Sequence, residues 1–460
     1  MPTLEIPRLL VAGVASGVGK TTVMVALSRA LRARGLRVAP FKCGPDYLDP
    51  TWHARAAGAP SHNLDGWMMG REAVLSTFAR ASQGADVALI EGVMGLYDGA
   101  APDAEDGSAA QIAKWLSAPT VAVVDASGMA RTIAALGLGL RSFDPQLQLA
   151  GLFANRVGSR GHLDLLRAAC AGTVPVLGGL PQEPALAFPE RHLGLVAADQ
   201  ASAPEEQFDQ WGALLAEWCS PEALLAIARA APPLEVPRLD PPSGRLRRCR
   251  IALARDAAFH FYYEDNLRRL EGLGAELVPF SPIADAALPR DVSGVYLGGG
   301  YPELHAEALS ANASLRLSLQ TFAGRGGLVY AECGGLMYLS RAIRTLDGRT
   351  HEMVGLVPGV AAMERKLQAL GYVEVETTAR TPLGEAGLRF RGHQFRYSTL
   401  EGAQAEDLAY RVRRRRGGST APEGYGRGNV LASYVHAHWA SNPMAAEGFV
   451  SACAAFARDR

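Results

Sequence analysis

The sequence has no excess charge of either sign, because 46 Lys and Arg residues balance 46 Asp and Glu residues among its 460 positions. A balanced chain has no overall field that favours nucleic acid or an anionic membrane. Long hydrophobic runs are also missing. No apolar stretch approaches the ~18 residues of a membrane span, and the N-terminus lacks the pattern of a signal peptide. We therefore expect neither nucleic acid nor membrane as a partner.

Cysteine is scarce, and its six copies are far apart with no Cys-x-x-Cys pair. This spacing argues against a zinc site or a disulfide framework and favours the reducing cytoplasm. The apolar share of 48% and the charged share of 20% are ordinary for a globular protein. Nothing in the sequence reports on oligomeric state, and a homodimer is our working expectation.

A proline-rich stretch divides the chain. Residues 231–245 carry five prolines without apolar periodicity, which is typical of a semi-rigid linker. We predict a first domain over 1–230, a linker over 231–247 and a second domain over 248–460.

Both predicted domains alternate short apolar strands with helix-like segments. The predicted strands are 8–12, 37–42, 86–91, 120–125 and 149–154, then 250–254, 292–297, 327–332, 372–377 and 430–435. This alternation favours mostly parallel sheets covered by helices, so the predicted fold class is α/β in both domains.

The first predicted strand runs into a glycine-rich loop, VAGVASGVGKTTVMVAL, at residues 11–27. A strand, such a loop and then a helix form the geometry that binds a nucleotide triphosphate, because backbone N–H groups cradle phosphate and a lysine reaches its oxygens. The strict pattern fails only where Val14 replaces its first glycine. We expect an ATP site that includes Gly13, Ser16, Gly17, Val18, Gly19, Lys20, Thr21 and Thr22.

Charged side chains follow the next two strands, at FKCGPDYLDP (41–50) and ALIEGVMGLYDG (88–99). The carboxyl ends of parallel strands share one edge of a sheet, so these groups converge on the loop. Carboxylates beside a Thr hydroxyl and phosphate oxygens suit Mg²⁺. The alternative is that Asp and Glu cap turns here.

These three motifs resemble the ligase domain of cobyrinic acid a,c-diamide synthases, a group related to dethiobiotin synthetase. The resemblance implies that ATP activates a carboxylate as an acyl phosphate, with Mg²⁺ held by Thr21, Asp46 and Glu91 and phosphate held by Lys20. It places Lys42, Tyr47, Asp49 and Asp98 near substrate or phosphate, and Asn155 of FANRVGS against adenine. Ala15 and Ser16 depart from the loop of related partitioning ATPases.

The second domain contains VYAECGGLMYL at residues 329–339, where a strand runs into a helix through Cys333. Glycines after the cysteine permit the sharp turn of a nucleophile elbow, and a helix N-terminus is expected to lower the thiol pKa. The N–H of Gly334, with Gly299 and Gly300 after another strand, is expected to bind an oxyanion. The other five cysteines read as small buried apolar residues.

A thiol nucleophile needs a base, and SYVHAHW supplies His436 and His438 at the end of a late strand. This domain resembles the glutamine amidotransferase domain of the same cobalamin enzymes, a variant of class I glutaminases. The resemblance implies that Cys333 attacks the glutamine amide and that His436 activates it. Where typical members have Glu, this chain has His438, so the third triad member is unassigned. His393 lies in RGHQFRYST, which also resembles the family.

Together these features predict a glutamine-dependent ligase. The resemblance implies that it amidates the a and c acetates of cobyrinic or hydrogenobyrinic acid, so corrin, glutamine and ATP are the expected ligands. Two alternatives stay open at this point: a cobyric acid synthase, which amidates other positions, and a P-loop switch ATPase with a partner-binding domain. Arg411 and Arg413 to Arg416 either steer a polyanionic substrate or form a solvated loop.

Overall fold

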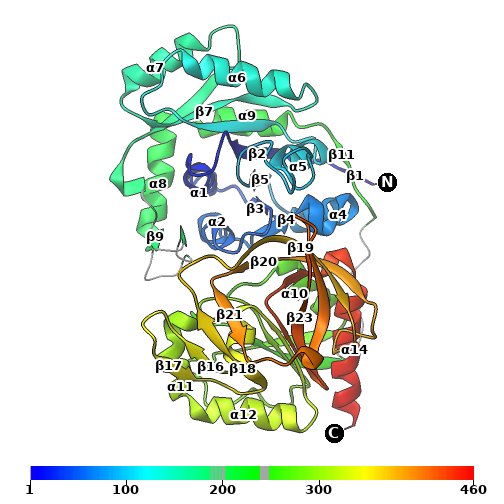
Figure 1. The fold of residues 1–460 in the computed structure, drawn as a ribbon. Helices are drawn as coiled ribbons and strands as arrows, with labels where there is room; N and C mark the ends of the chain where they lie inside the picture. Colours follow the sequence, from blue (N-terminus) through cyan, green and yellow to red (C-terminus); the bar gives the residue numbers. More distant parts are fainter. Residues whose placement is uncertain are drawn as a thin grey trace. The chain divides into compact units, whose positions relative to one another are not determined.

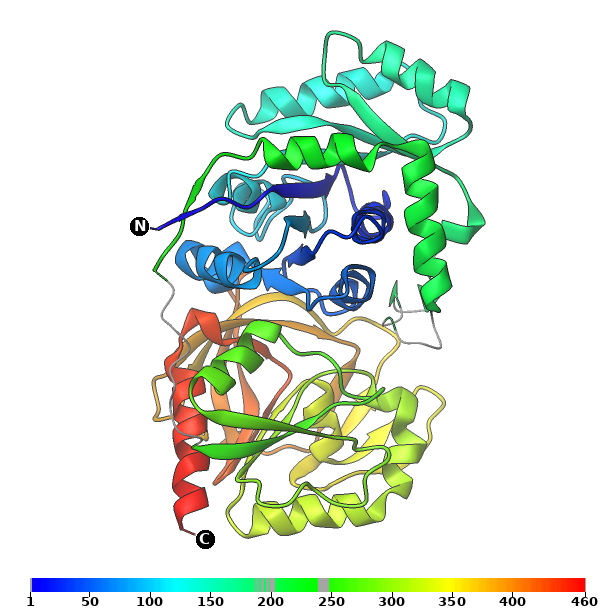
Figure 2. The same cartoon turned by 180° about the vertical axis from the view of Figure 1, so that it is seen from behind.

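The computed structural model describes residues 2–186, 188, 190–191, 194–195, 198, 203–238 and 248–459. The chain divides into two compact units, Met1–Leu239 and Asp240–Arg460. Each unit is an α/β structure, as predicted (Figures 1 and 2). Within the described residues, no helix combines the length and apolar character needed to span a bilayer.

The N-terminal unit contains a seven-stranded sheet in the order β4-β3-β5-β2-β6-β7-β8, with every neighbouring pair parallel. Its strands are β2 (Arg8–Gly13), β3 (Val38–Cys43), β4 (His62–Leu64), β5 (Val87–Glu91), β6 (Thr120–Asp125), β7 (Leu149–Val157) and β8 (Val176–Pro181). The central strands are buried throughout, as expected when helices cover both faces.

Helices lie on both faces of this sheet (Figure 1). The helices are α1 (Lys20–Arg32), α2 (Asp49–Ala57), α3 (Gly66–Met69), α4 (Arg71–Ala81), α5 (Ala109–Trp115), α6 (Thr132–Phe143), α7 (Arg160–Ala169), α8 (Glu205–Trp218) and α9 (Pro221–Arg229). One core joins α1, α2, α8 and α9 to the sheet, and a second core joins α6 and α7 to β6 and β7. Alternate residues of β6 serve these two cores, because successive side chains of a strand point to opposite faces.

The predicted linker begins inside the N-terminal unit. Strand β11 (Leu234–Glu235) pairs with β1 (Thr3–Leu4), which anchors the first part of the proline-rich stretch. Strand β9 (Glu190–Arg191) pairs antiparallel with β10 (Gly194–Leu195). Residues 239–247 of the predicted linker lie outside the described residues.

The C-terminal unit is built on a ten-stranded mixed sheet in the order β13-β12-β14-β15-β24-β23-β22-β19-β20-β25. Its parallel half is β13 (Ala275–Phe280), β12 (Cys249–Ala254), β14 (Gly294–Leu297), β15 (Leu328–Glu332) and β24 (Val430–Ser433). Its antiparallel half is β23 (Thr420–Arg427), β22 (Leu408–Arg414), β19 (Ala369–Thr377), β20 (Arg389–Arg396) and β25 (His436–His438). A smaller sheet has the order β17-β16-β18-β21, with β16 (Ser340–Arg344), β17 (Thr350–Glu352), β18 (Val357–Met363) and β21 (Ser398–Glu401).

The parallel half separates two cores. Helices α11 (Ala306–Ala311), α12 (Ala313–Gly324) and α13 (Gly334–Leu339) share one core, and α10 (Glu264–Gly272) and α14 (Met444–Arg458) share the other. Cys333 belongs to the first core, whereas Tyr296 and Tyr330 belong to the second. A side chain at position 332 therefore points away from the side chain of Cys333.

The sheet curls until its two distant strands β24 and β25 lie close together. These strands stand five positions apart in the sheet order, yet only residues 434 and 435 separate them along the chain. The antiparallel half also contributes to the core of α10 and α14. This curl brings β25 and its histidines to the carboxyl end of β15, although the sequence predicted them as the end of β24.

Candidate active sites

The glycine-rich loop takes the phosphate-binding form that the sequence predicts. Gly17 and Gly19 have φ values of 77° and 92°, a region that disfavours residues with a side chain. A Cβ on Gly19 would also lie 2.0 Å from Nδ2 of Asn155. The chain then enters α1 at Lys20, so the loop and the helix N-terminus present N–H groups to one place.

Lys20 lies folded over this loop. Its Nζ donates to the carbonyl oxygens of Ala15 at 3.0 Å and Met94 at 2.6 Å. Burial and the nearby Lys42 lower the pKa of Lys20. These carbonyls hold the ammonium group where an anionic phosphate would replace them as a stronger partner.

Glu91 is the centre of a buried polar cluster at the end of β5. Its Oε1 accepts from Thr21 Oγ1 at 2.9 Å and from Lys42 Nζ at 2.8 Å, and its Oε2 lies 2.5 Å from Nε2 of His53. Burial raises the pKa of Glu91, but Lys42 and His53 outweigh burial and hold it well below its ordinary value. Glu91 is therefore a fixed anion beside Thr21.

His53 was not identified from the sequence as a site residue. It lies in α2, is fully buried, and its other ring nitrogen is 3.4 Å from Oγ of Ser61. A histidine in a helix has no signal that distinguishes a core residue from a carboxylate partner. Only the packing of α2 against β3 brings it to Glu91.

Lys42 lies behind the cavity rather than on its wall. Its Nζ bonds Asp49 at 2.7 Å, Glu91 at 2.8 Å and the carbonyl of Gly92 at 3.1 Å. Burial lowers the pKa of Lys42, but the two carboxylates outweigh this effect and raise it well above its ordinary value. In this structure Lys42 is an internal counter-ion, and the place near substrate or phosphate predicted for it stays a prediction.

Asp46 and Asp98, two further carboxylates predicted as site residues, accept hydrogen bonds from backbone N–H groups of turns. Such turn capping is the alternative to metal or substrate binding that the sequence left open. Asp46 Oδ1 accepts from the N–H groups of Leu48 at 2.8 Å and Asp49 at 3.0 Å, which orders the start of α2. Asp98 Oδ2 accepts from the N–H of Gly95 at 2.8 Å. Asp46 nevertheless lines the cavity, whereas Asp98 and Tyr47 do not.

Asn155 and Arg156 tie the end of β7 to the phosphate loop. Asn155 Nδ2 donates to the carbonyl of Val18 at 2.9 Å, and Arg156 donates to the carbonyl of Gly17 at 3.0 Å. Arg156 has a positive φ of 59° and pairs with Asp125. The sequence predicted an adenine contact for Asn155, and it gave no signal for Arg156.

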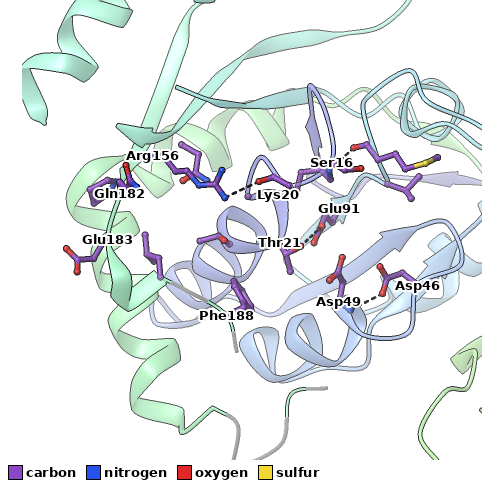
Figure 3. A pocket seen from close by; sticks show the side chains of 18 residues that line it. Ser16, Lys20, Thr21, Asp46, Asp49, Glu91, Arg156, Gln182, Glu183 and Phe188 are labelled. Atoms are coloured by element: carbon purple, nitrogen blue, oxygen red, sulfur yellow. Dashed lines mark hydrogen bonds between the residues drawn. The ribbon is translucent and has the colours of Figure 1, made fainter. Parts of the chain in front are cut away.

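A cavity of about 800 Å³ opens at this edge of the sheet. Figure 3 shows Thr21 and Glu91 directed toward each other, with Asp46 and Asp49 nearby and with Arg156, Gln182 and Glu183 on the opposite wall. Ten predicted residues line it: Ser16, Gly17, Gly19, Lys20, Thr21, Thr22, Asp46, Asp49, Glu91 and Asn155. Gly13 and Val18 support the loop from behind, since a Cβ on Gly13 would lie 2.7 Å from the Val18 side chain.

The donor set fits Mg²⁺ bound together with phosphate. A Thr hydroxyl and carboxylate oxygens are the hard ligands that this ion prefers. Within the described residues, no group of three or more His, Cys, Asp or Glu is arranged to hold a metal by itself. Such a site is consistent with an ion that takes its remaining ligands from nucleotide and water.

Cys333 forms a nucleophile elbow in the C-terminal unit. It has φ 48° and ψ −100° between β15 and α13, a strained conformation for a residue with a Cβ. Gly335 packs at this turn, because a Cβ there would lie 2.4 Å from the carbonyl oxygen of Leu297. This strand–turn–helix geometry is the one predicted from the sequence. The backbone N–H of Cys333 donates to the carbonyl oxygen of Ser433 at 2.7 Å.

The protonation of this thiol differs from the prediction. The sequence predicted a lowered pKa, but burial and Glu303 raise the pKa of Cys333 to about 12, against smaller lowering effects of Arg396 and the Gly334 N–H. Burial also lowers the pKa of His436 to about 3. In the free protein, the site is therefore a neutral thiol and a neutral imidazole.

The glycines at positions 299 and 300, which follow β14, lie against both His436 and the Cys333 elbow. A Cβ on Gly334 would lie 3.1 Å from the N of Gly300, and a Cβ on Gly299 would lie 2.5 Å from Cε1 of His436. The N–H of Gly299 already donates to the carbonyl of Phe261 at 3.3 Å. The candidate oxyanion donors therefore narrow to Gly300 and Gly334.

Two more histidines lie beside His436. The ring of His393, on β20, stacks on His436 with centroids 4.9 Å apart, and its Nδ1 lies 2.9 Å from the Tyr263 hydroxyl. His438 is fully buried with its ring 4.6 Å from that of Tyr263, and burial lowers its pKa to about 4. These contacts give His438 no anionic character that would replace the usual Glu.

Two arginines of the arginine run lie near carboxylates on the surface of the sheet. Arg411 approaches Glu376 at 3.7 Å and Arg413 approaches Glu374 at 3.9 Å across β22 and β19. Two arginines of β20, at positions 389 and 391, approach the same two carboxylates from the other side. The solvated reading of this run therefore describes these positions better than substrate steering does.

Two family models match the chain. Residues 9–196 match the CobQ/CobB/MinD/ParA nucleotide binding domain, and residues 250–444 match the CobB/CobQ-like glutamine amidotransferase domain. The protein therefore joins a nucleotide-binding domain to a glutamine amidotransferase domain.

Its relatives narrow this class. A cobyrinate a,c-diamide synthase of Leptospira interrogans is 52% identical over 452 residues, covering 98% of this chain and 99% of that protein. Those of Syntrophotalea carbinolica and Dehalococcoides mccartyi are 46% and 41% identical, covering 98% and 97% of this chain and 99% and 98% of those proteins. The chain belongs to the cobyrinate a,c-diamide synthase family and is a carbon–nitrogen ligase that takes nitrogen from glutamine, which confirms the resemblance noted in the sequence.

We predict that Lys42→Met destabilises the N-terminal unit by about 3–5 kcal/mol, because it leaves buried Glu91 and Asp49 without their cation. Urea unfolding followed by tryptophan fluorescence measures this, since five of the six tryptophans lie in that unit. Arg37→Met is the matched control. It breaks an exposed pair with Asp86 and should cost far less than Lys42→Met, because solvent screens the charges of exposed pairs. Equal losses in the two variants would contradict the internal counter-ion role.

We also predict that alkylation of Cys333 by iodoacetamide accelerates about tenfold per pH unit between about pH 7 and pH 9, because only the thiolate reacts and the thiol pKa is about 12. The rate is measured by mass spectrometry of the peptide that contains Cys333, with Cys333→Ser as the blank. A rate that is already constant below about pH 8 would mean that the free protein holds a thiolate.

Proposed function

We propose that the protein catalyses ATP- and glutamine-dependent amidation of the a and c acetate carboxylates of cobyrinic or hydrogenobyrinic acid. The observation that carries this proposal is that one chain holds both a phosphate-loop cavity with a Thr21–Glu91 pair and a strained Cys333 elbow near His436. The names of its relatives, which match over nearly the whole chain, supply the substrate class.

In the N-terminal unit, ATP binds with its phosphates on the loop that begins α1. Lys20 exchanges its carbonyl partners for phosphate oxygens, and Asn155, which lines the cavity, is the proposed contact for the base. A substrate carboxylate attacks the terminal phosphorus, the bond to the bridging oxygen breaks, and ADP leaves an acyl phosphate behind. Positioning and charge stabilisation supply most of the catalysis in such transfers.

Thr21, Asp46 and Glu91 are the residues that would hold Mg²⁺ in this cavity. When bound, the ion neutralises charge that develops on the phosphate oxygens. Glu91 is already ionised and fixed by Lys42 and His53, so little reorganisation is needed to present its oxygens.

In the C-terminal unit, the Cys333 sulfur attacks the amide carbon of glutamine while the thiol proton passes to His436. The N–H groups of Gly300 and Gly334, two glycines that lie against each other, are the proposed donors to the oxyanion. Ammonia leaves with a proton from His436, and water then hydrolyses the thioester to glutamate. Ammonia displaces phosphate from the acyl phosphate and forms the amide.

The family membership bears on the two alternative functions that the sequence left open. Family membership as a ligase removes the switch ATPase. A cobyric acid synthase shares both chemistries, but each of the relatives described above is named an a,c-diamide synthase, which favours the a and c positions. A homodimer stays a prediction.

The decisive experiment incubates the protein with ATP, Mg²⁺, glutamine and, in separate reactions, cobyrinic acid and hydrogenobyrinic acid. We expect two amidations of one corrin, identified by chromatography with mass spectrometry and by NMR assignment of the amidated side chains. Amidation at other side chains would favour the cobyric acid synthase alternative. Hydrolysis of ATP without amidation of either corrin would overturn the proposed substrate.

Two variants separate the half-reactions. We predict that Cys333→Ser abolishes glutamine hydrolysis but still amidates the corrin with free ammonia, because the ligase site is in the other unit. Glu91→Gln should show the reverse, with glutaminase retained and ADP formation lost by about 10²-fold or more, as charge at the phosphate site is removed. Loss of both activities in Cys333→Ser would contradict two separate sites.

A further inference from the structure

Glu332 is a buried carboxylate that the steps above do not use. It directly precedes Cys333 and is 1% exposed. Its Oε1 accepts from the Tyr330 hydroxyl at 2.7 Å and from the backbone N–H of Ala437 at 3.1 Å, and its Oε2 accepts from the Tyr296 hydroxyl at 3.1 Å. The bond to Ala437 joins the end of the nucleophile strand to the residue that follows His436.

Strand β25 needs such a support. It has three residues and lies at the end of the ten-stranded sheet, where β20 is its one pairing strand among the described residues. Side chains satisfy its other edge. Glu332 accepts from the N–H of Ala437, while Asn266 donates to the carbonyl of Ala437 at 2.8 Å and accepts from the N–H of Trp439 at 2.9 Å.

The tyrosines extend this support. The rings of Tyr296 and Tyr330 pack against Trp439, with centroids 5.6 Å and 5.5 Å away. Glu332 therefore binds two hydroxyl groups whose rings hold the segment just after His436. Its side chain and that of Cys333 lie on opposite faces of β15, so Glu332 acts on this segment without facing the thiol.

We propose that Glu332 is the positioning residue of the glutaminase site, the carboxylate that fixes the His436 segment against the Cys333 elbow. A triad carboxylate orients the histidine through a hydrogen bond to the imidazole. Glu332 orients His436 through a hydrogen bond to the backbone N–H of the next residue, Ala437. The inference rests on the proposed function, in which Cys333 and His436 hydrolyse glutamine. It gives this chain a carboxylate for the site where His438 occupies the usual position of Glu.

The positioning role of Glu332 depends on the length of its side chain and the placement of its acceptor oxygens more than on its charge, because the three groups that donate to it are neutral. A glutamine in this place keeps the carbonyl oxygen for Ala437 and Tyr330 and can offer its amide group to the oxygen of Tyr296. An aspartate keeps the charge but is one methylene shorter. A methionine fills a similar volume and accepts no strong hydrogen bond.

The test compares glutamine hydrolysis by Glu332→Gln, Glu332→Asp and Glu332→Met. We expect Glu332→Gln to keep most of the wild-type kcat, and the other two to lose about 10- to 100-fold in kcat with a smaller change in KM, since a shift of about 1 Å can cost 10²-fold. Tyr330→Phe is the matched control. It removes a donor from the same carboxylate but leaves the bond to Ala437, and it should change kcat little.

Ammonia-dependent amidation is measured on every variant and should stay at the wild-type level, which reports that the N-terminal unit is intact. Far-UV circular dichroism and thermal unfolding of each variant report whether the C-terminal unit is folded. The inference is overturned if Glu332→Asp and Glu332→Met keep the wild-type kcat, or if Glu332→Gln falls as far as they do. If Glu332→Met does not fold, Glu332→Asp against Glu332→Gln decides the question. Cys333→Ser distinguishes a failure of the Glu332 inference from a failure of the proposed function, because glutaminase activity in that variant would refute the proposed function itself.

Discussion

The two sites depend on one backbone constraint: a strand must end at the sheet edge and turn through a conformation that side chains disfavour. Among the described residues, the non-glycine residues with positive φ are Met94, Ser117, Arg156, Asp291 and Cys333. Met94 and Arg156 line the phosphate cavity, and Cys333 is the proposed nucleophile. Such conformations cost about 1–3 kcal/mol each and persist only where packing holds them. The buried cores on both faces of each sheet provide that packing.

The two sites differ in the charge of their buried groups, although both lie where a strand ends at the sheet edge. In the N-terminal unit, ionised groups are buried together, so Glu91 stays an anion beside Lys42 and His53. In the C-terminal unit, burial keeps His436 neutral, and burial together with Glu303 raises the pKa of the Cys333 thiol. The first arrangement suits a cation and polyphosphate. The second suits a proton transfer that begins only when a substrate is bound.

Much of the fold was predictable where strands are continuous and apolar. Predicted strands 8–12, 120–125 and 250–254 correspond to β2, β6 and β12, because parallel strands buried on both faces read as apolar runs. Strands β8, β13 and most of the antiparallel half were not predicted. β8 carries two glycines, and β20 and β22 alternate arginines with buried residues, so their sequences resemble loops and charged surfaces.

The sequence alone determined the chemistry of each site, because a phosphate loop and a nucleophile elbow are local: their residues are neighbours in the chain and their geometry follows from glycine and strand ends. It thus predicted the loop, Glu91 and Cys333. Only the tertiary structure decided which distant groups complete the sites. His53, Arg156 and Glu332 gain their roles from contacts across strands and helices, and Lys42 gains its counter-ion role from contacts with Asp49 and Glu91. Burial, which sets the pKa of Cys333, is likewise a property of the packed fold that no local pattern contains.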